Sequence, residues 1–157
     1  MKNKGFTLIE IVIAVAIVAV LSTLVTPQVR NQLAKGKDTK AIATLSSLRI
    51  ASQMYQMEHT EKLIEPDDYD SDEKVKEAFQ KLSEYLDPNA KKILKDAKIE
   101  IGGSKNSKDA GIQYGGELFF TFKNPDEKGK SDGIYLWFKL PENIGQFDSR
   151  GVEWKSY

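Results

Sequence analysis

One long apolar run near the N-terminus limits what this chain can fold into more than any other feature. Between Phe6 and Val25 the polar residues are Thr7, Glu10, Ser22 and Thr23. As a helix rising about 1.5 Å per residue, the run is roughly 30 Å long, which matches the hydrocarbon core of one bilayer. The sequence therefore predicts a single transmembrane helix at this end of the chain.

Glu10 is an acid inside the apolar run. At the centre of a membrane helix an acid costs about 2.5–3.5 kcal/mol, and less near the helix end, where it can reach the headgroups. The nearest candidate for a compensating partner is a positive charge from another chain. We therefore expect Glu10 to pair with such a charge and to fix the axial register of neighbouring helices, because breaking the pair leaves a buried charge.

The segment Gly5-Phe6-Thr7-Leu8-Ile9-Glu10, the apolar run behind it and Pro27 resemble the N-terminal signature of type IV pilins and of the pseudopilins of type II secretion systems. The resemblance implies that a prepilin peptidase cleaves between Gly5 and Phe6 and that Phe6 is then N-methylated. It also implies that Glu10 meets the terminal amine of a neighbouring subunit. Ala19 departs from the pattern, since many pilins have glycine there.

The same resemblance implies a division of the chain into a leader (1–5), a transmembrane and filament-core helix (6–26) and an outward-facing globular domain (27–157). Subunit assembly would depend on Phe6, Glu10 and Pro27. The implied partners are other copies of the chain, other pilin-like subunits, the prepilin peptidase and methyltransferase, the membrane and an assembly platform.

The implied location is a single-pass membrane protein with a cytoplasmic N-terminus before assembly, and an extracellular or periplasmic filament afterwards. Lys2 and Lys4 favour this orientation by the positive-inside tendency, although Arg30, Lys35 and Lys37 weaken the asymmetry. A secretory signal peptide and an uncleaved signal anchor are the alternatives. The first is disfavoured because residues 21–27 contain no clear small-x-small cleavage site.

After the membrane run the pattern predicts a second helical half. Pro27 should kink or locally melt the helix around residues 23–27. The helix then continues to about Glu61, with an apolar face formed by Ile42, Leu45, Leu48, Ala51 and Tyr55. We interpret this face as packing on the globular domain. Val29 and Leu33 are better candidates for contact between subunits.

Shorter elements follow this helix. Asp70 and Glu73 can form a capping box before a second helix that carries Val75, Ala78, Phe79, Leu82, Tyr85 and Leu86. A third short helix is expected after Asp87-Pro88, with proline at its first position and Ile93, Leu94 and Ala97 on one face.

From residue 98 the apolar period changes to two. Strands are predicted at 98–101, 112–114, 117–123 and 134–140, and a last one near 152–157, with a loop at 102–111. The strands at 117–123 and 134–140 should form an antiparallel hairpin at the centre of the domain. The predicted fold class is α+β: a long N-terminal helix packed on a small antiparallel sheet.

Catalytic chemistry is nearly absent from the sequence. Formal charge balances at 23 basic against 23 acidic residues, and there is no cysteine for thiol chemistry or a disulfide. His59, the single histidine, lies among polar residues, and we interpret it as a surface side chain. No nucleophile elbow, phosphate loop or metal-ligand spacing is present. We therefore predict no enzyme activity, no cofactor and no catalytic or metal site.

Two charged clusters leave ligand hypotheses to test. Asp67, Asp68, Asp70 and Asp72 could suggest calcium, but they lack the glycine and final glutamate of a twelve-residue calcium loop, so a solvated loop is favoured. Lys91, Lys95 and Lys98 would share a helix face, but Asp96 interrupts the charge and no aromatic residues interleave, so DNA is disfavoured as a partner.

The sequence thus predicts a structural subunit of a type IV pilus-like filament. A type II secretion pseudopilin is the alternative within the family. An anchored adhesion or binding domain that never polymerises is an alternative of another class, but it leaves Glu10 unexplained. A secreted enzyme is disfavoured by the missing site chemistry.

Overall fold

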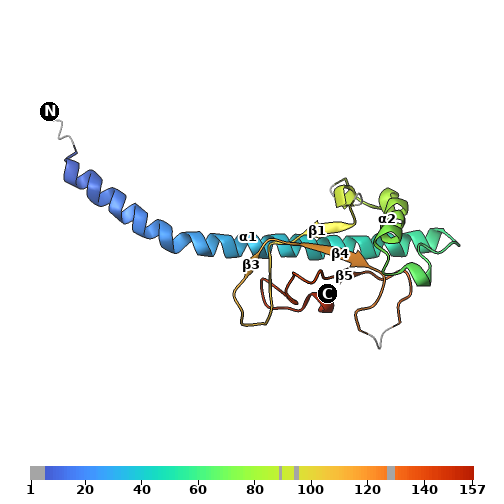
Figure 1. The fold of residues 1–157 in the computed structure, drawn as a ribbon. Coiled ribbons are helices and arrows are strands. Elements are labelled where there is room, and N and C mark those ends of the chain that lie inside the picture. The colour runs from blue at the N-terminus through green and yellow to red at the C-terminus, as the bar shows by residue number, and fades with distance from the viewer. Residues whose placement is uncertain (1–5, 89, 94–95, 127–129) are drawn as a thin grey trace. The chain divides into compact units, whose positions relative to one another are not determined.

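The computed structural model describes residues 6–88, 90–93, 96–126 and 130–157. The chain divides into two compact units between Leu33 and Ala34. Helix α1 (Leu8–Glu58) contributes to both units and is drawn from blue to green in Figure 1. This confirms the predicted long N-terminal helix, which ends three residues before the expected Glu61.

In the first unit α1 presents apolar side chains to its surroundings on all sides. The described large apolar residues between Leu8 and Val25 are 52–83% exposed, as expected of a helix whose solvent is lipid or other helices. Of the two outcomes predicted for residues 23–27, a kink or local melting, local melting is wrong, because α1 continues through Pro27. Proline removes only one backbone donor. Close by, the Ser22 and Thr26 hydroxyls donate to the carbonyls of Val18 and Ser22, both at 2.8 Å.

In the second unit one face of α1 forms the floor of the core. Leu45, Leu48, Ala51 and Tyr55 are buried and Ile42 is partly buried against them, so the predicted packing face is confirmed. Helix α2 (Asp72–Lys81) adds Val75, Ala78 and Phe79 to the same core. The remaining helical elements are single 3-10 turns: η1 (Pro66–Asp68), η2 (Leu82–Tyr85), η3 (Ala90–Ile93) and η4 (Trp154–Ser156).

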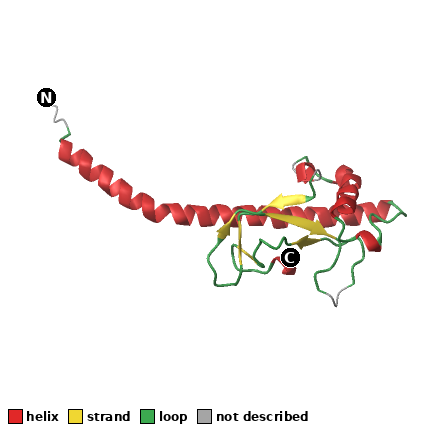
Figure 2. Ribbon diagram, in the orientation of Figure 1, coloured by secondary structure: helices red, strands yellow, loops and turns green. Residues whose placement is uncertain are grey.

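Among the described residues of this unit, six short strands form two antiparallel sheets. The strands are yellow in Figure 2. The first sheet has the order β1-β4-β5, formed by β1 (Lys98–Glu100), β4 (Glu117–Thr121) and β5 (Trp137–Lys139). Phe120 pairs with Phe138 in register, and both side chains are buried with Leu118. The predicted central hairpin and its inward face are therefore confirmed.

The second sheet was not predicted. It has the order β3-β2-β6, formed by β2 (Gly103–Lys105), β3 (Gln113–Tyr114) and β6 (Phe147–Asp148). Strand β2 lies inside the segment 102–111 that was expected to be a loop. The predicted last strand at 152–157 is also wrong: Glu153 forms one bridge with Phe147, and Trp154 then begins η4 with its indole fully buried.

The predicted helix starts need correction as well. Ser71, not Asp70, is the N-cap of α2, and its hydroxyl accepts from the Lys74 amide at 3.5 Å. The third helix is the 3-10 turn η3, which begins at Ala90, after Pro88, with the Asp87 carboxylate accepting from the Ala90 amide at 3.2 Å. Leu94, expected on its apolar face, lies outside the described residues.

Candidate functional site

The sequence-predicted assembly residues lie on the first unit. Gly5 is outside the described residues. Phe6 precedes α1 and is 85% exposed, Glu10 lies in the first turn of α1, and Pro27 lies in the helix interior. Within the described part of the chain no protein segment covers the Phe6 ring or the Glu10 carboxylate.

A reciprocal hydrogen-bonded cap begins α1. The Thr7 amide and the Thr7 hydroxyl donate to Oε2 of Glu10 at 2.8 and 2.9 Å, and the Thr7 hydroxyl oxygen accepts from the Glu10 amide at 3.4 Å. This is the geometry of a capping box, in which two of the unpaired amides of a first turn are satisfied. Glu10 is therefore held at the start of the helix by its own chain.

The cap changes the cost of an acid in the apolar run. One carboxylate oxygen of Glu10 is hydrogen-bonded, while Oε1 has no partner among the described residues. A negative charge in the first turn is also favoured by the helix dipole. The site can thus hold a carboxylate at the helix end and still offer an oxygen to an incoming cation. Sequence reasoning missed Thr7, although Thr7-Leu8-Ile9-Glu10 has the S/T-x-x-E spacing of such a cap.

Apolar exposure on α1 extends beyond the transmembrane length. Val29 and Leu33 are 49% and 65% exposed, and their role in contacts between subunits stays a prediction. Among the described residues α1 is the one helix long and apolar enough to cross a membrane, by length and composition alone.

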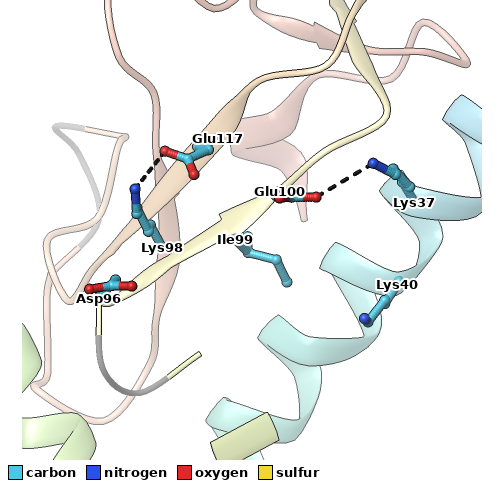
Figure 3. A pocket seen from close by; sticks show the side chains of 7 residues that line it. All are labelled: Lys37, Lys40, Asp96, Lys98, Ile99, Glu100 and Glu117. Atoms are coloured by element: carbon cyan, nitrogen blue, oxygen red, sulfur yellow. Dashed lines mark hydrogen bonds and ion pairs between the residues drawn. The ribbon is translucent and has the colours of Figure 1, made fainter. Parts of the chain in front are cut away.

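The second unit contains a shallow groove of about 300 Å³ between α1 and the edge strand β1 (Figure 3). Both signs of charge line it and neutralise each other: Lys37 pairs with Glu100 at 3.4 Å, and Lys98 pairs with Glu117 at 2.8 Å. The hydrogen bond to Glu117 raises the pKa of Lys98. The groove is lined by Lys37, Lys40, Asp96, Lys98, Ile99, Glu100 and Glu117.

This arrangement corrects the lysine face considered for DNA. Lys98 lies on strand β1 instead of on a helix, and Lys95 lies outside the described residues. Lys98 is also paired with Glu117, so it does not offer the free positive charge on a helix face that the disfavoured DNA hypothesis needed.

The acidic loop is partly neutralised from the sheet. Nζ of Lys139 lies 3.3 Å from Asp70 and 2.8 Å from Asp72. Within the described ranges, no group of three or more His, Cys, Asp or Glu side chains is positioned to hold a metal ion. His59 is exposed and its ring stacks on Tyr55 at 4.1 Å, at the end of α1.

Comparison with known proteins gives matches at the N-terminal end of the chain. Residues 1–26 match the family described as the prokaryotic N-terminal methylation motif. A fimbrial protein of Pseudomonas aeruginosa is 39% identical over 51 residues, which is 32% of this chain and 33% of the relative. The type II secretion system core protein G of Escherichia coli K12 is 34% identical over 58 residues, 37% of this chain and 40% of the relative.

A third relative is the prepilin peptidase-dependent protein D of Escherichia coli K12, 36% identical over 58 residues, 37% of this chain and 40% of the relative. In these three comparisons the match therefore spans about a third to two fifths of the relative's length. No solved structure matches the chain significantly.

Proposed function

The N-terminal segment of this chain belongs to the family that carries the prokaryotic N-terminal methylation motif, and we propose that the chain is a structural, non-enzymatic subunit of a type IV pilus-like filament. In this proposal a prepilin peptidase cleaves between Gly5 and Phe6, and Phe6 is N-methylated. The processed helix anchors the subunit in the membrane until it joins other copies in an extracellular or periplasmic filament. Its partners are the peptidase and methyltransferase, an assembly platform and other pilin-like subunits.

One observation carries the proposal: the apolar surface of α1 between Leu8 and Val25 has no partner among the described residues. The large apolar side chains that the structure describes between Leu8 and Val25 remain at least half exposed. Burying such a side chain gains about 1.5–3 kcal/mol relative to leaving it in water. Inside a bilayer lipid supplies that environment, and outside it copies of the same helix can supply it. A filament built around these helices therefore keeps the surface out of water.

Glu10 sets the register in this proposal. Cleavage would create an amine at Phe6, and the free Oε1 of Glu10 from a neighbouring copy can accept a hydrogen bond from it. In low dielectric this attraction is much larger than in water. Helices that slide past each other by a turn would lose the pair and leave a buried charge, which costs several kcal/mol.

A type II secretion pseudopilin is the second candidate, because the relatives named type II secretion system core protein G match a share of the chain at least as large as the fimbrial relative does. Both candidates use the same processing and the same helix. They differ in the system that assembles them, so deletion of the chain tests them: loss of surface filaments supports the pilus, and loss of protein secretion supports the pseudopilus. An anchored domain that never polymerises would leave Glu10 without its proposed partner.

Two substitutions at Glu10 separate its charge from its cap. Glu10→Gln removes the charge but keeps an oxygen for the Thr7 amide, since Gln also completes a capping box. Glu10→Ala removes both. With the peptidase present, we expect both variants to reduce the yield of sheared filaments at least tenfold, and Thr7→Val, which keeps the amide and the charge, to assemble near the wild-type level.

Wild-type yield from Glu10→Gln would show that assembly needs the cap instead of the charge and would exclude the register role. Mass spectrometry of the sheared protein checks processing independently, with a methylated Phe6 expected as the first residue. Retention of residues 1–5 on filaments would contradict the proposal as a whole.

A further inference from the structure

The C-terminal segment Phe147–Tyr157 supplies a core residue although it has little regular structure. It contains β6, the two residues Phe147 and Asp148, and the single turn η4. Trp154 is fully buried and meets Phe138 edge-to-face, with ring centroids 5.4 Å apart. Because so short a strand contributes few ladder hydrogen bonds, other contacts must hold this segment in place.

A buried carboxylate on α1 supplies one of them. The Asp38 side chain is fully buried, and its two oxygens serve different segments. Oδ1 accepts from the amides of Gly102 and Gly103 at 2.8 and 3.4 Å, and Oδ2 accepts from the amide of Ser149 at 3.0 Å. Hydrogen bonds to an ionised acceptor are roughly twice as strong as neutral ones.

The charge of Asp38 depends on these amides. In the described part of the chain Asp38 forms no ion pair with a Lys, Arg or His side chain. A buried charge without partners is strongly unfavourable. If the C-terminal segment lifted away, Oδ2 would lose its donor, so closure of the segment and solvation of the charge are coupled.

A second side chain of α1 holds the other end of the segment. Arg49 donates from Nη2 to the main-chain oxygen of Tyr157 at 2.6 Å and from Nε to the carbonyl of Leu136 at 2.8 Å. Asp38 and Arg49 are eleven residues apart, or about 16 Å along a helix. The segment is therefore attached to one rigid rod at two separated points.

Between these two points the segment keeps its own shape. The buried Asp148 carboxylate accepts from the amides of Arg150 and Val152 at 2.8 and 2.9 Å, and from the hydroxyl of Tyr157 at 2.7 Å. Arg150 Nε also donates to Asp148 at 2.8 Å. These bonds lie within the segment, so they can persist when the segment leaves α1.

We propose that residues 147–157 form a strap that opens from α1 as a unit while the β1-β4-β5 sheet stays folded, and that Asp38 is its latch. Opening would expose Trp154 and the Arg150–Gly151 peptide bond. The inference concerns the second unit alone, and it holds or fails independently of the proposed filament function.

Trypsin can report strap opening in the full-length chain in detergent. Arg150 is exposed, but Gly151 is buried close to the Lys108 backbone, so trypsin can bind the bond between them only when the strap leaves its place. Lys130 is exposed and serves as an internal control. We expect Asp38→Asn, which keeps the side-chain shape, to accelerate cleavage after Arg150 at least tenfold and to leave cleavage after Lys130 unchanged. The matched control Asp67→Asn alters an exposed acid and should change neither rate.

Equal acceleration at both sites would mean that Asp38 stabilises the whole unit, and unchanged cleavage at Arg150 would mean that it holds nothing; either result overturns the latch. Native-state hydrogen exchange of the wild-type chain keeps the proposal testable if Asp38→Asn does not fold. The amide of Ser149, which donates to Asp38 across the contact with α1, should exchange at least tenfold faster than the amides of β4, and equal protection would overturn the strap.

Discussion

The hydroxyl of Tyr85 donates a 2.6 Å hydrogen bond to the carboxylate of Glu58, and so joins η2 to the last residue of α1. This hydrogen bond is the main reason why the pKa of Tyr85 is raised to about 12. The neutral hydroxyl is the donor, so ionisation of Tyr85 breaks the link.

The first prediction follows from that shift. The stabilisation from Tyr85 is fully present below its ordinary pKa of about 10 and is lost as the pH rises through about 12. Ultraviolet titration of tyrosinate should show a transition near pH 12 to which both Tyr85 and Tyr157 contribute, and Tyr85→Phe should reduce its amplitude. Glu58→Gln should move the Tyr85 transition toward lower pH. An unchanged high-pH transition in both variants would contradict the assignment.

Gly102 gives a steric prediction. A Cβ at this position would lie 2.0 Å from the Ala34 carbonyl oxygen and 2.2 Å from its Cα, and backbone atoms of a helix cannot move aside cheaply. We expect Gly102→Ala to lower the free energy of unfolding by about 1–3 kcal/mol or more, as overpacking does. Gly111→Ala is the matched control, because no atom lies within 4 Å of its Cβ position. Chemical denaturation compares the two, and equal effects would refute the close approach.

A substitution at Arg49 tests whether its two main-chain contacts need a planar guanidinium. Its guanidinium bonds two main-chain oxygens and lies 3.8 Å from the centre of the Tyr135 ring, and burial lowers its pKa. Lysine keeps the charge but cannot form this fork. Arg49→Lys should therefore cost about 1.5–3 kcal/mol of unfolding free energy. The exposed Arg30→Lys should cost almost nothing in the same thermal or denaturant melts, and a similar loss in both would count against the fork.

The lowered pKa of Asp148 leads us to predict that acid destabilises the folded protein. Burial alone would raise its pKa, but the hydrogen bonds from Val152, Tyr157 and Arg150 outweigh burial and hold the pKa below its ordinary value. Its contribution is thus present above about pH 4 and is lost as the pH falls through the lowered pKa. Asp148→Asn should destabilise the protein by about 2 kcal/mol at neutral pH. The difference from wild type should shrink below about pH 4, and a constant difference down to pH 2 would contradict the prediction.

The parts of the fold that the sequence predicted are those with strong periodicity. The face of Leu45, Leu48 and Tyr55 follows the helical repeat, and Leu118 and Phe120 alternate as a half-buried strand does, so both were read correctly. Strands β2 and β6 contain three and two residues, too few for an alternation to be visible, and their pairing is imposed by the surrounding fold. Around Trp154 the apolar and polar residues alternate as they do in a half-buried strand. A 3-10 turn that buries one large ring between polar neighbours has the same sequence pattern, so the sequence could not distinguish the two.

The candidate site was predicted in part for a similar reason. Glu10 stood out because an acid in an apolar run has a cost, whereas Asp38 lies near the charged residues Lys37 and Lys40, where an acid draws no attention, and the sequence analysis made no prediction for it. Its burial could not be predicted, because its partners are main-chain amides that carry no sequence signal. Thr7 could have been found from its spacing to Glu10.

The cap of Thr7 and Glu10 has a consequence for maturation. Both residues lie on the C-terminal side of the Gly5–Phe6 bond, and the Thr7 amide that donates to Glu10 is not consumed when that bond is hydrolysed. Cleavage there would replace a neutral peptide group before α1 by a cationic amine, while the first turn of α1 keeps its shape. Cleavage would thereby change the charge that neighbouring subunits meet at the start of α1 and leave the fold of the subunit unchanged.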